Sequence, residues 1–282
     1  MKKIKNKIKK ISEFKKITRD IKKVKIQGAR NIALAALKAY FLFPNKKSRK
    51  KLLSLRPTEP MLENVLDLAE KGYNQKQILS HFNFSQDKIN SSVFKLIKNK
   101  EIIFTHCHST NVVNSLIYTK KKGKNFQVYN TETRPLYQGR KTAKELEKAG
   151  IQVTQFVDSA VGIALSNEQG TKSVDKVFLG ADALTDKGII NKVGSETISI
   201  IAKENKIPVY IIADSWKYSH KQDIPLENRK LNEVWDKAPK KIKIKNPSFE
   251  FVSKKYIKGI ITEFGLMKYD NFLKKVKKKN LK

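Results

Sequence analysis

The sequence predicts an α/β fold in which a helical N-terminal domain precedes a Rossmann-like domain built on a parallel sheet. Two patterns lead to this prediction. Before residue 98, apolar residues recur at every third or fourth position, which is the helical period, and strand-like alternation is missing. After residue 99, short apolar stretches alternate with helical stretches, as in a parallel sheet covered by helices on both faces. We therefore predict a helical domain at 1–98 and a Rossmann-like α/β domain at 99–282.

The helical segments of the first domain are separated by short breaks. Residues 2–25 place an isoleucine, phenylalanine or valine at steps of three or four with lysines between them, which predicts an amphipathic helix. Gly28 marks a break before a second helix that runs to about Tyr40, and the proline-containing stretch 55–60 is a predicted loop. Further helices are predicted at 63–71, 74–81 and 86–98.

Five apolar stretches of the second domain are predicted strands with helices between them. The strands are expected at 102–105, 126–129, 153–157, 176–180 and 209–213, and the helices at 109–122, 139–149, 159–167 and 194–205. Ligands of such sheets bind beyond the carboxyl ends of the strands. Cys107, Asp182 and Asp214 each follow a predicted strand, so we expect them to converge on one rim of the sheet.

The chain is strongly basic, with 60 Lys and Arg against 26 Asp and Glu in 282 residues and a net charge of +34. The lysines are spread along the chain rather than gathered in a stripe interleaved with aromatic residues. We interpret them as a consequence of AT-rich coding and expect only non-specific binding to nucleic acid, although they would also attract an anionic substrate. Denser basic clusters, which we interpret as solvated helix faces and tails, lie at 2–25, 46–51, 240–245 and 274–282.

The cysteine content and the apolar segments bear on the compartment. One cysteine excludes an internal disulfide framework and is typical of the reducing cytoplasm. The longest apolar stretch, 31–44, contains Lys38 and is too short to span a bilayer, so we expect no membrane association. We also expect no signal peptide, because no apolar core follows the basic first residues.

Cys107 lies in the stretch EIIFTHCHST with a histidine on each side. A zinc site would need further soft or imidazole ligands at suitable spacing, and a redox pair would need a second cysteine, so neither is expected. A Cys–His hydrolase dyad and an inert buried thiol remain as alternatives. The position between a strand and a helix favours a functional thiol, because helix N–H groups would lower its pKa. With Ser109, Thr110 and Asn111, these groups would also bind an anion.

Asp182 has two interpretations. An aspartate that follows a strand often caps the next turn. The same residue shares its predicted rim with Asn191 and Lys192. A carboxylate beside a lysine and a thiol would form an acid–base pair with a cationic clamp.

Four longer motifs resemble those of a known family. They are TETRPLYQGRKTAKEL (131–146), FLGADAL (178–184), NKVGS (191–195) and ADSWKYS (213–219). The family joins methylthioribose-1-phosphate isomerase, archaeal ribose-1,5-bisphosphate isomerase, and the regulatory alpha, beta and delta subunits of the eukaryotic translation-initiation guanine-nucleotide-exchange factor. The short chain and the first motif are most similar to the ribose-bisphosphate isomerase and the alpha subunit. The presence of both a cysteine and the aspartate of FLGADAL favours the enzyme, because the exchange-factor subunits need neither.

The resemblance implies a catalytic role for two residues and a substrate-holding role for three. Cys107 would accept the proton from C2 of the sugar, and Asp182 would protonate the ring oxygen and help to open the furanose ring. Asn191 and Lys192 would hold the substrate near this aspartate. Lys217 matches a substrate-binding lysine of the family.

The resemblance also implies phosphate-binding residues. They lie in three segments and are Gln27, Gly28, Ala29, Arg30, Arg56, Ser109, Thr110 and Asn111. Gln27 stands where the family has an arginine, and His108 stands where the enzymes usually have asparagine.

The expected function is the isomerisation of an aldose 1-phosphate to a ketose, with ribose 1,5-bisphosphate as the leading substrate in nucleoside and AMP salvage. The resemblance implies no metal or other cofactor, a homodimer or homohexamer, and AMP as a candidate effector. Two alternatives stay open. One is a methylthioribose-1-phosphate isomerase, and the other is a non-catalytic regulatory subunit that binds a nucleotide or sugar phosphate.

Overall fold

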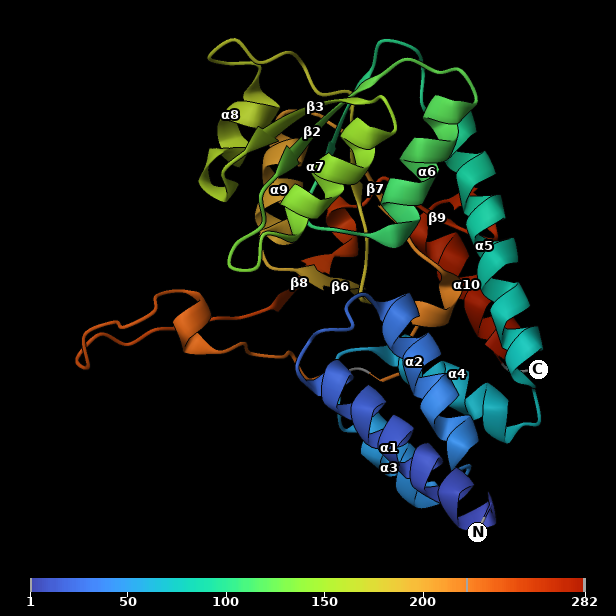
Figure 1. Ribbon diagram of the computed structural model, residues 1–282. Coiled ribbons are helices and arrows are strands. Elements are labelled where there is room, and N and C mark those ends of the chain that lie inside the picture. Colours follow the sequence, from blue (N-terminus) through green and yellow to red (C-terminus); the bar gives the residue numbers. More distant parts are fainter. Residues whose placement is uncertain (1, 222, 281–282) are drawn as a thin grey trace.

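Five helices precede the first strand in the part of the chain that the structure describes, residues 2–221 and 223–280 of a computed structural model (Figure 1). They are α1 (Lys2–Lys22), α2 (Ala29–Leu42), α3 (Lys46–Leu53), α4 (Pro60–Glu70) and α5 (Gln75–Leu96). Their apolar faces pack into two adjoining clusters, one around Ile32 and Leu66 and the other around Leu37 and Val65. The prediction of a helical N-terminal region is confirmed.

Two features of this region differ from the sequence-based prediction. α3 occupies the basic stretch 46–51, and the side chain of Asn45 caps it by accepting a hydrogen bond from Ser48 N at 3.0 Å. α5 is one continuous helix, so the prediction of two helices at 74–81 and 86–98 is wrong. No glycine or proline interrupts this stretch, and its packing on both neighbouring cores favours an unbroken helix.

α5 connects the helical region to the sheet. Ile78 and Phe82 in its first half pack among the N-terminal helices. Ile89 and Val93 in its second half pack among residues of the sheet and of the helices that cover it. The helix therefore contributes to both cores, and the domain boundary at residue 98 stays a prediction.

Seven strands of the described chain form the main sheet, in the spatial order β10-β9-β7-β4-β1-β2-β3. The strands are β1 (Ile102–Thr105), β2 (Gln127–Thr131), β3 (Gln152–Phe156), β4 (Lys176–Leu179), β7 (Val209–Ile212), β9 (Gly259–Thr262) and β10 (Gly265–Met267). Neighbouring strands run parallel except β9 and β10, which are antiparallel. The predicted α/β class with a mostly parallel sheet is confirmed.

Helices cover both faces of this sheet. α6 (Thr110–Lys121) and α7 (Gln138–Lys148) pack with α5 on one face, and α8 (Val161–Ser166), α9 (Ser195–Glu204) and α10 (Tyr269–Asn280) pack on the other. The side chains of β1 alternate between the two cores: Ile103 points to the first and Phe104 to the second. Both are fully buried, as is typical of a strand at the centre of a parallel sheet.

A small antiparallel sheet extends the fold at the carboxyl ends of the main strands. It contains β5 (Ala183–Leu184), β6 (Gly188–Lys192) and β8 (Phe249–Ser253) in the order β5-β6-β8. The sequence-based prediction contains no strand at these positions. Between the short helix η2 (Ser215–Lys217) and β8, the chain makes an excursion away from the body of the molecule, which we call the projecting segment, 230–245 (Figure 1).

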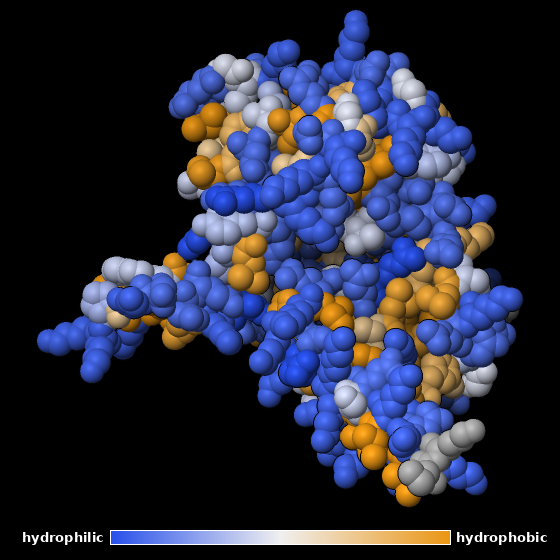
Figure 2. All heavy atoms as spheres, viewed as in Figure 1, coloured by the Kyte–Doolittle hydropathy of each residue, from blue (hydrophilic) through white to orange (hydrophobic). Residues whose placement is uncertain are grey.

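The surface is dominated by charged and polar side chains. Figure 2 shows a largely hydrophilic face with hydrophobic patches, hollowed between the helical region and the sheet region. Within the described residues, no helix is both long enough and apolar enough to cross a membrane. Of the predicted basic cluster 274–282, the last two residues lie outside the described residues.

Candidate active site

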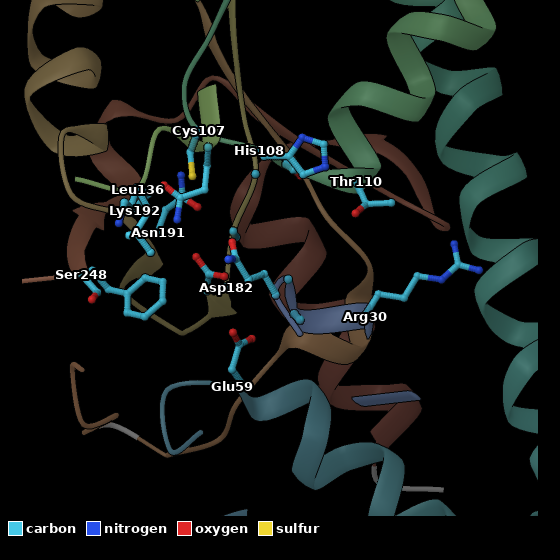
Figure 3. Close-up of a pocket in the computed structure, with 18 of the residues that line it drawn as sticks. Arg30, Glu59, Cys107, His108, Thr110, Leu136, Asp182, Asn191, Lys192 and Ser248 are labelled. Atoms are coloured by element: carbon cyan, nitrogen blue, oxygen red, sulfur yellow. The ribbon is translucent and has the colours of Figure 1, made fainter. Parts of the chain in front are cut away.

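One cavity between the helical region and the carboxyl ends of the strands is lined by every residue predicted for the site (Figure 3). The helical region contributes Gln27, Gly28, Ala29, Arg30 and Arg56. The sheet region contributes Cys107, Ser109, Thr110, Asn111, Asp182, Asn191, Lys192 and Lys217. The fold thus brings these residues together, and the chemical role of each stays a prediction.

Cys107 lies in the turn between β1 and α6. Its φ of 64° puts this non-glycine residue in the left-handed region, a conformation that costs about 1–3 kcal/mol and persists only where neighbours hold it. Two threonines hold it here. Thr133 Oγ1 accepts a hydrogen bond from Cys107 N at 3.0 Å, and Thr142 Oγ1 donates one to Cys107 O at 2.8 Å. The sulfur atom is directed towards the side of the cavity that carries Lys192 (Figure 3).

Burial raises the pKa of the Cys107 thiol to about 11, although the ammonium group of Lys192 acts in the opposite direction. The prediction of a low pKa at a helix N-terminus is therefore wrong for this site. The free energy lost when the thiolate is removed from water is larger than the stabilisation that the nearby N–H groups and Lys192 provide. At neutral pH the group is mainly a thiol with a small thiolate fraction.

The histidines beside Cys107 have different surroundings. Burial lowers the pKa of His106 to about 4, so its ring is neutral. Its Nε2 lies 2.9 Å from the carbonyl oxygen of Val193 and therefore carries the proton. His108 lines the cavity, and its Nδ1 lies 3.0 Å from Thr142 Oγ1. Because that hydroxyl already donates its proton elsewhere, His108 Nδ1 is the donor in this contact.

Asp182 follows β4 and lies at the centre of the cavity in Figure 3. Burial raises its pKa, and the surrounding cations, Lys217 foremost, lower it. Glu59 is only 3% exposed, and burial followed by the negative charge of Asp182 raises its pKa to about 8. Two carboxyl groups that interact in one buried space retain a proton between them at neutral pH.

Arg56 is buried between two carboxylates. Its Nε donates to Glu227 Oε1 at 2.9 Å, and its Nη2 donates to Glu59 Oε1 at 3.2 Å. A phosphate group at this position would share the guanidinium group with these two residues. The phosphate-clamping role of Arg56 stays a prediction.

Two helices direct their N-termini at the cavity, and neither has a side-chain cap hydrogen bond. Gly28, with φ of 83°, precedes α2, and Ser109 precedes α6. The first N–H groups of a helix lack partners within the helix and attract anions. The cavity therefore offers two anion-binding positions on opposite parts of the fold.

Several buried polar atoms of the cavity lack a hydrogen-bond partner. Of seven such side-chain atoms in the described part of the chain, four belong to residues that line the cavity: Glu59 Oε2, Ser109 Oγ, Gln138 Oε1 and Ser248 Oγ. Buried polar atoms are nearly always satisfied in folded proteins. Their concentration in one cavity indicates a polar ligand that completes these bonds.

Arg30 does not turn into the cavity. In Figure 3 its side chain points away from Asp182. Its Nη2 donates to Asn83 Oδ1 at 3.2 Å, and the guanidinium carbon lies 5.4 Å from the centroid of the Phe82 ring. In this structure Arg30 does not replace the family arginine that is absent at Gln27, so an anion near α2 would depend on backbone N–H groups.

Two lysines and an asparagine surround Asp182. Lys217 Nζ donates to the carbonyl oxygen of Ala181 at 2.5 Å. Asn191 Nδ2 donates to Ser195 Oγ at 2.9 Å. Lys192 is 6% exposed and lines the cavity from β6. The two lysines supply positive charge to the cavity.

Sequence reasoning missed five residues that build the site: Glu59, Thr133, Thr142, Asp158 and Glu227. Asp158 accepts hydrogen bonds from Thr133 N at 2.8 Å and Arg134 N at 2.6 Å, and thereby supports the threonine that binds Cys107 N. Glu59 was detectable, because it stands three residues after Arg56 in the loop LRPTEP. Thr133 and Thr142 lie within the motif 131–146, whereas Asp158 and Glu227 carry no local signal.

Asp214 follows β7 at the same edge of the parallel sheet as Cys107 and Asp182, as predicted, but it is not among the residues that line the cavity. Its Oδ1 lies 3.2 Å from His81 Nε2 on α5 and accepts from Trp216 N at 2.9 Å. With His81 and Glu263 it forms a cluster whose potential ligand atoms lie within 4.8 Å of one another. Glu263 bonds to Ser215, so this cluster links α5 to the segment that carries Lys217.

Comparison with known proteins identifies relatives of this chain. The Initiation factor 2 subunit family matches residues 25–269. The ribose 1,5-bisphosphate isomerase of Methanocaldococcus jannaschii is 37% identical over 279 residues, which cover 88% of this chain and 89% of that protein. The protein of the same name from Archaeoglobus fulgidus is 32% identical and covers 87% of this chain and 86% of its own.

Solved structures show the same fold. The translation initiation factor eIF-2B of Pyrococcus horikoshii OT3 superimposes with a TM-score of 0.77 at 25% identity, covering 90% of this chain and 96% of that chain. The family match spans most of the sequence, including both regions that line the cavity. The chain belongs to the Initiation factor 2 subunit family.

Proposed function

We propose that this protein is an aldose–ketose isomerase that converts ribose 1,5-bisphosphate to ribulose 1,5-bisphosphate in nucleoside and AMP metabolism. One observation carries the proposal: a single cavity holds a thiol, a carboxyl group with a raised pKa, and buried lysines. These are Cys107, Asp182, Lys192 and Lys217. Relatives that bear this enzyme name over most of their length support it.

These residue types suit the reaction. The anomeric oxygen of a 1-phosphorylated aldose is esterified, so the ring cannot open as a free hemiacetal. Asp182 gives its proton to the ring oxygen as the bond between C1 and that oxygen breaks. The thiolate form of Cys107 takes the proton from C2 and later returns it to C1. Burial suits Asp182 to the role of acid, because its raised pKa keeps it protonated to a higher pH.

Two anion-binding positions favour a bisphosphate over a monophosphate. The N-terminus of α2 after Gly28 and that of α6 after Ser109 both face the cavity. Each can bind a phosphate group through its free N–H groups. A 5-deoxy sugar phosphate or methylthioribose 1-phosphate would use one of them only.

The test is a direct assay of the purified protein. Ribose 1,5-bisphosphate is expected to be converted to ribulose 1,5-bisphosphate with the highest kcat/KM among three substrates, the others being 5-deoxyribose 1-phosphate and methylthioribose 1-phosphate. If either of these two is converted with a higher kcat/KM, the protein is still an aldose–ketose isomerase, but ribose 1,5-bisphosphate is not its substrate. If the protein binds a sugar phosphate but converts none of the three, the result would indicate a regulatory subunit. AMP, added to the same assay, tests the proposed effector.

We also propose that the protein acts in the cytoplasm as a homo-oligomer, a dimer or a hexamer. The projecting segment exposes four large apolar side chains: Leu231 is 51%, Val234 40%, Trp235 50% and Ile242 47% exposed. Figure 1 shows this segment reaching away from the body of the molecule, and Figure 2 shows hydrophobic atoms among the hydrophilic ones on it. Large apolar side chains gathered on such a segment are typical of surfaces that a partner copy covers.

Trp235→Glu is expected to shift the protein towards smaller species, because it puts a charge where apolar area would be buried between copies. Light scattering coupled to size-exclusion chromatography measures the mass. Lys240→Glu, on the same segment and also exposed, is the control for an added negative charge and should leave the mass unchanged. An unchanged mass for Trp235→Glu would remove this segment from the interface.

A further inference from the structure

Glu59 is a cavity carboxyl group that the reaction as described does not use. It is 3% exposed, and its Oε1 accepts from Arg56 Nη2 at 3.2 Å. Its Oε2 is buried and has no hydrogen-bond partner in the described residues. In Figure 3 its carboxyl group points into the cavity towards Asp182. A buried carboxylate oxygen without a partner is costly, so this atom is available to a group that a ligand supplies.

The proposed reaction moves two protons by separate routes. The hydrogen on C2 travels to C1 by way of Cys107. The ring oxygen gains a proton from Asp182, and the hydroxyl group on C2 loses one when that carbon becomes a ketone. Asp182 ends each turnover without its proton, whereas the C2 hydroxyl has released one. The hydroxyl proton returns to Asp182 either directly or by way of another group in the cavity that can accept and release it.

The stereochemistry of C2 limits where this group can lie. The hydrogen and the hydroxyl group of a tetrahedral ring carbon point to opposite faces of the ring. The hydroxyl group therefore starts on the ring face away from Cys107. When C2 becomes planar in the enol, this oxygen lies in the plane of the double bond, and a base on the side away from the thiol can accept its proton. In Figure 3, Cys107 and Glu59 lie on opposite sides of Asp182 in the cavity.

We propose that Glu59 is a catalytic base that accepts the proton of the C2 hydroxyl group and passes it to Asp182. This inference rests on the proposed isomerase function. In the first half, the C2–H bond and the bond from C1 to the ring oxygen break and a C1=C2 enol forms. In the second half, the Cys107 thiol protonates C1, the O–H bond on C2 breaks towards Glu59, and the C2=O bond forms. Proton transfer from Glu59 to Asp182 closes the cycle without an oxidant or reductant.

The interaction between the two carboxyl groups supports the last step. The negative charge of Asp182 is the second cause, after burial, of the raised pKa of Glu59, which is about 8. In Figure 3 the carboxyl group of Glu59 points towards Asp182, and interacting carboxyl groups titrate as a pair that shares its protons. Burial raises the pKa of both carboxyl groups, which favours keeping a proton on the pair near neutral pH.

Glu59→Gln keeps the size of the side chain and can still accept at its amide oxygen, but it cannot take up a proton. We expect kcat for ribose 1,5-bisphosphate to fall by about 10²- to 10⁴-fold, the usual contribution of a general base, with KM changed by less than about threefold. In deuterated solvent, any exchange at C2 seen with the wild type should persist in the variant, because the first half does not need Glu59. Glu59→Asp should recover part of kcat.

The control is Glu227→Gln, which removes the other carboxylate from Arg56. It is expected to change KM more than kcat, because it acts through a predicted phosphate ligand. If Glu59→Gln instead raises KM at nearly normal kcat, Glu59 only positions Arg56 and the inference is overturned. A wild type that does not convert ribose 1,5-bisphosphate would be a failure of the proposed function, whereas an active wild type with an equally active Glu59→Gln would be a failure of this inference alone.

Discussion

Cys107→Ser is expected to lower kcat for ribose 1,5-bisphosphate by about 10²- to 10⁴-fold, because an alcohol is a far weaker base than a thiolate. The fold and substrate binding should persist. Serine has nearly the same volume, and the hydrogen bonds to Thr133 and Thr142 use only backbone atoms of residue 107. Measurements of kcat, of C2 proton exchange and of thermal unfolding separate the catalytic from the structural effect. A serine variant that exchanges and turns over like the wild type would remove Cys107 from the mechanism.

The high pKa of this thiol gives the prediction a second readout. Cys107 is the single cysteine of the chain, so iodoacetamide labelling reports on it alone. With a pKa of about 11, its labelling rate should rise about tenfold per pH unit between about pH 7 and 10, because the thiolate is the reactive form. Saturating sugar bisphosphate should protect it. Rapid labelling that does not depend on pH above 7 would indicate a low pKa and contradict the structure.

Asp182→Asn is expected to reduce kcat by about 10²- to 10⁴-fold, the usual scale for a lost general acid, while the substrate still binds. Asparagine keeps the size and part of the hydrogen bonding but cannot give a carboxylic proton to the ring oxygen. Steady-state kinetics and a direct binding measurement by calorimetry check both parts. A variant with near-normal turnover would leave Asp182 as a residue that only caps the turn after β4.

The pH profile of the wild type links the two residues. Turnover needs the thiolate of Cys107 and the acid form of Asp182 together. The thiolate fraction rises towards pH 11, whereas the carboxyl pair of Asp182 and Glu59, whose pKa values burial raises, loses its proton at alkaline pH. We therefore expect kcat/KM to rise above pH 7 and to reach its maximum at alkaline pH. A maximum below pH 7 would contradict these assignments.

The sequence alone predicted the helical N-terminal region, the first five parallel strands of the main sheet, and a set of residues that all line one cavity. Hydrophobic periodicity and strand-end position are local properties, and they predicted β1, β4 and the convergence of Cys107 with Asp182 on one cavity. The family motifs extended this to the loops before α2 and α4. The same local reasoning divided α5 into two helices, because the polar residues near its middle obscure a helix that packs on two different cores.

Tertiary structure decided the electrostatics of the site. The raised pKa of Cys107 follows from burial, which local sequence cannot report. Arg56 bonds to Glu227 from 171 positions away, and Arg30 turns to Asn83 on α5 instead of the cavity. The approach of Glu59 to Asp182 likewise joins two regions distant in sequence. Charges act through space over a few ångströms, so the chemistry of each group depends on which distant residues the fold places beside it.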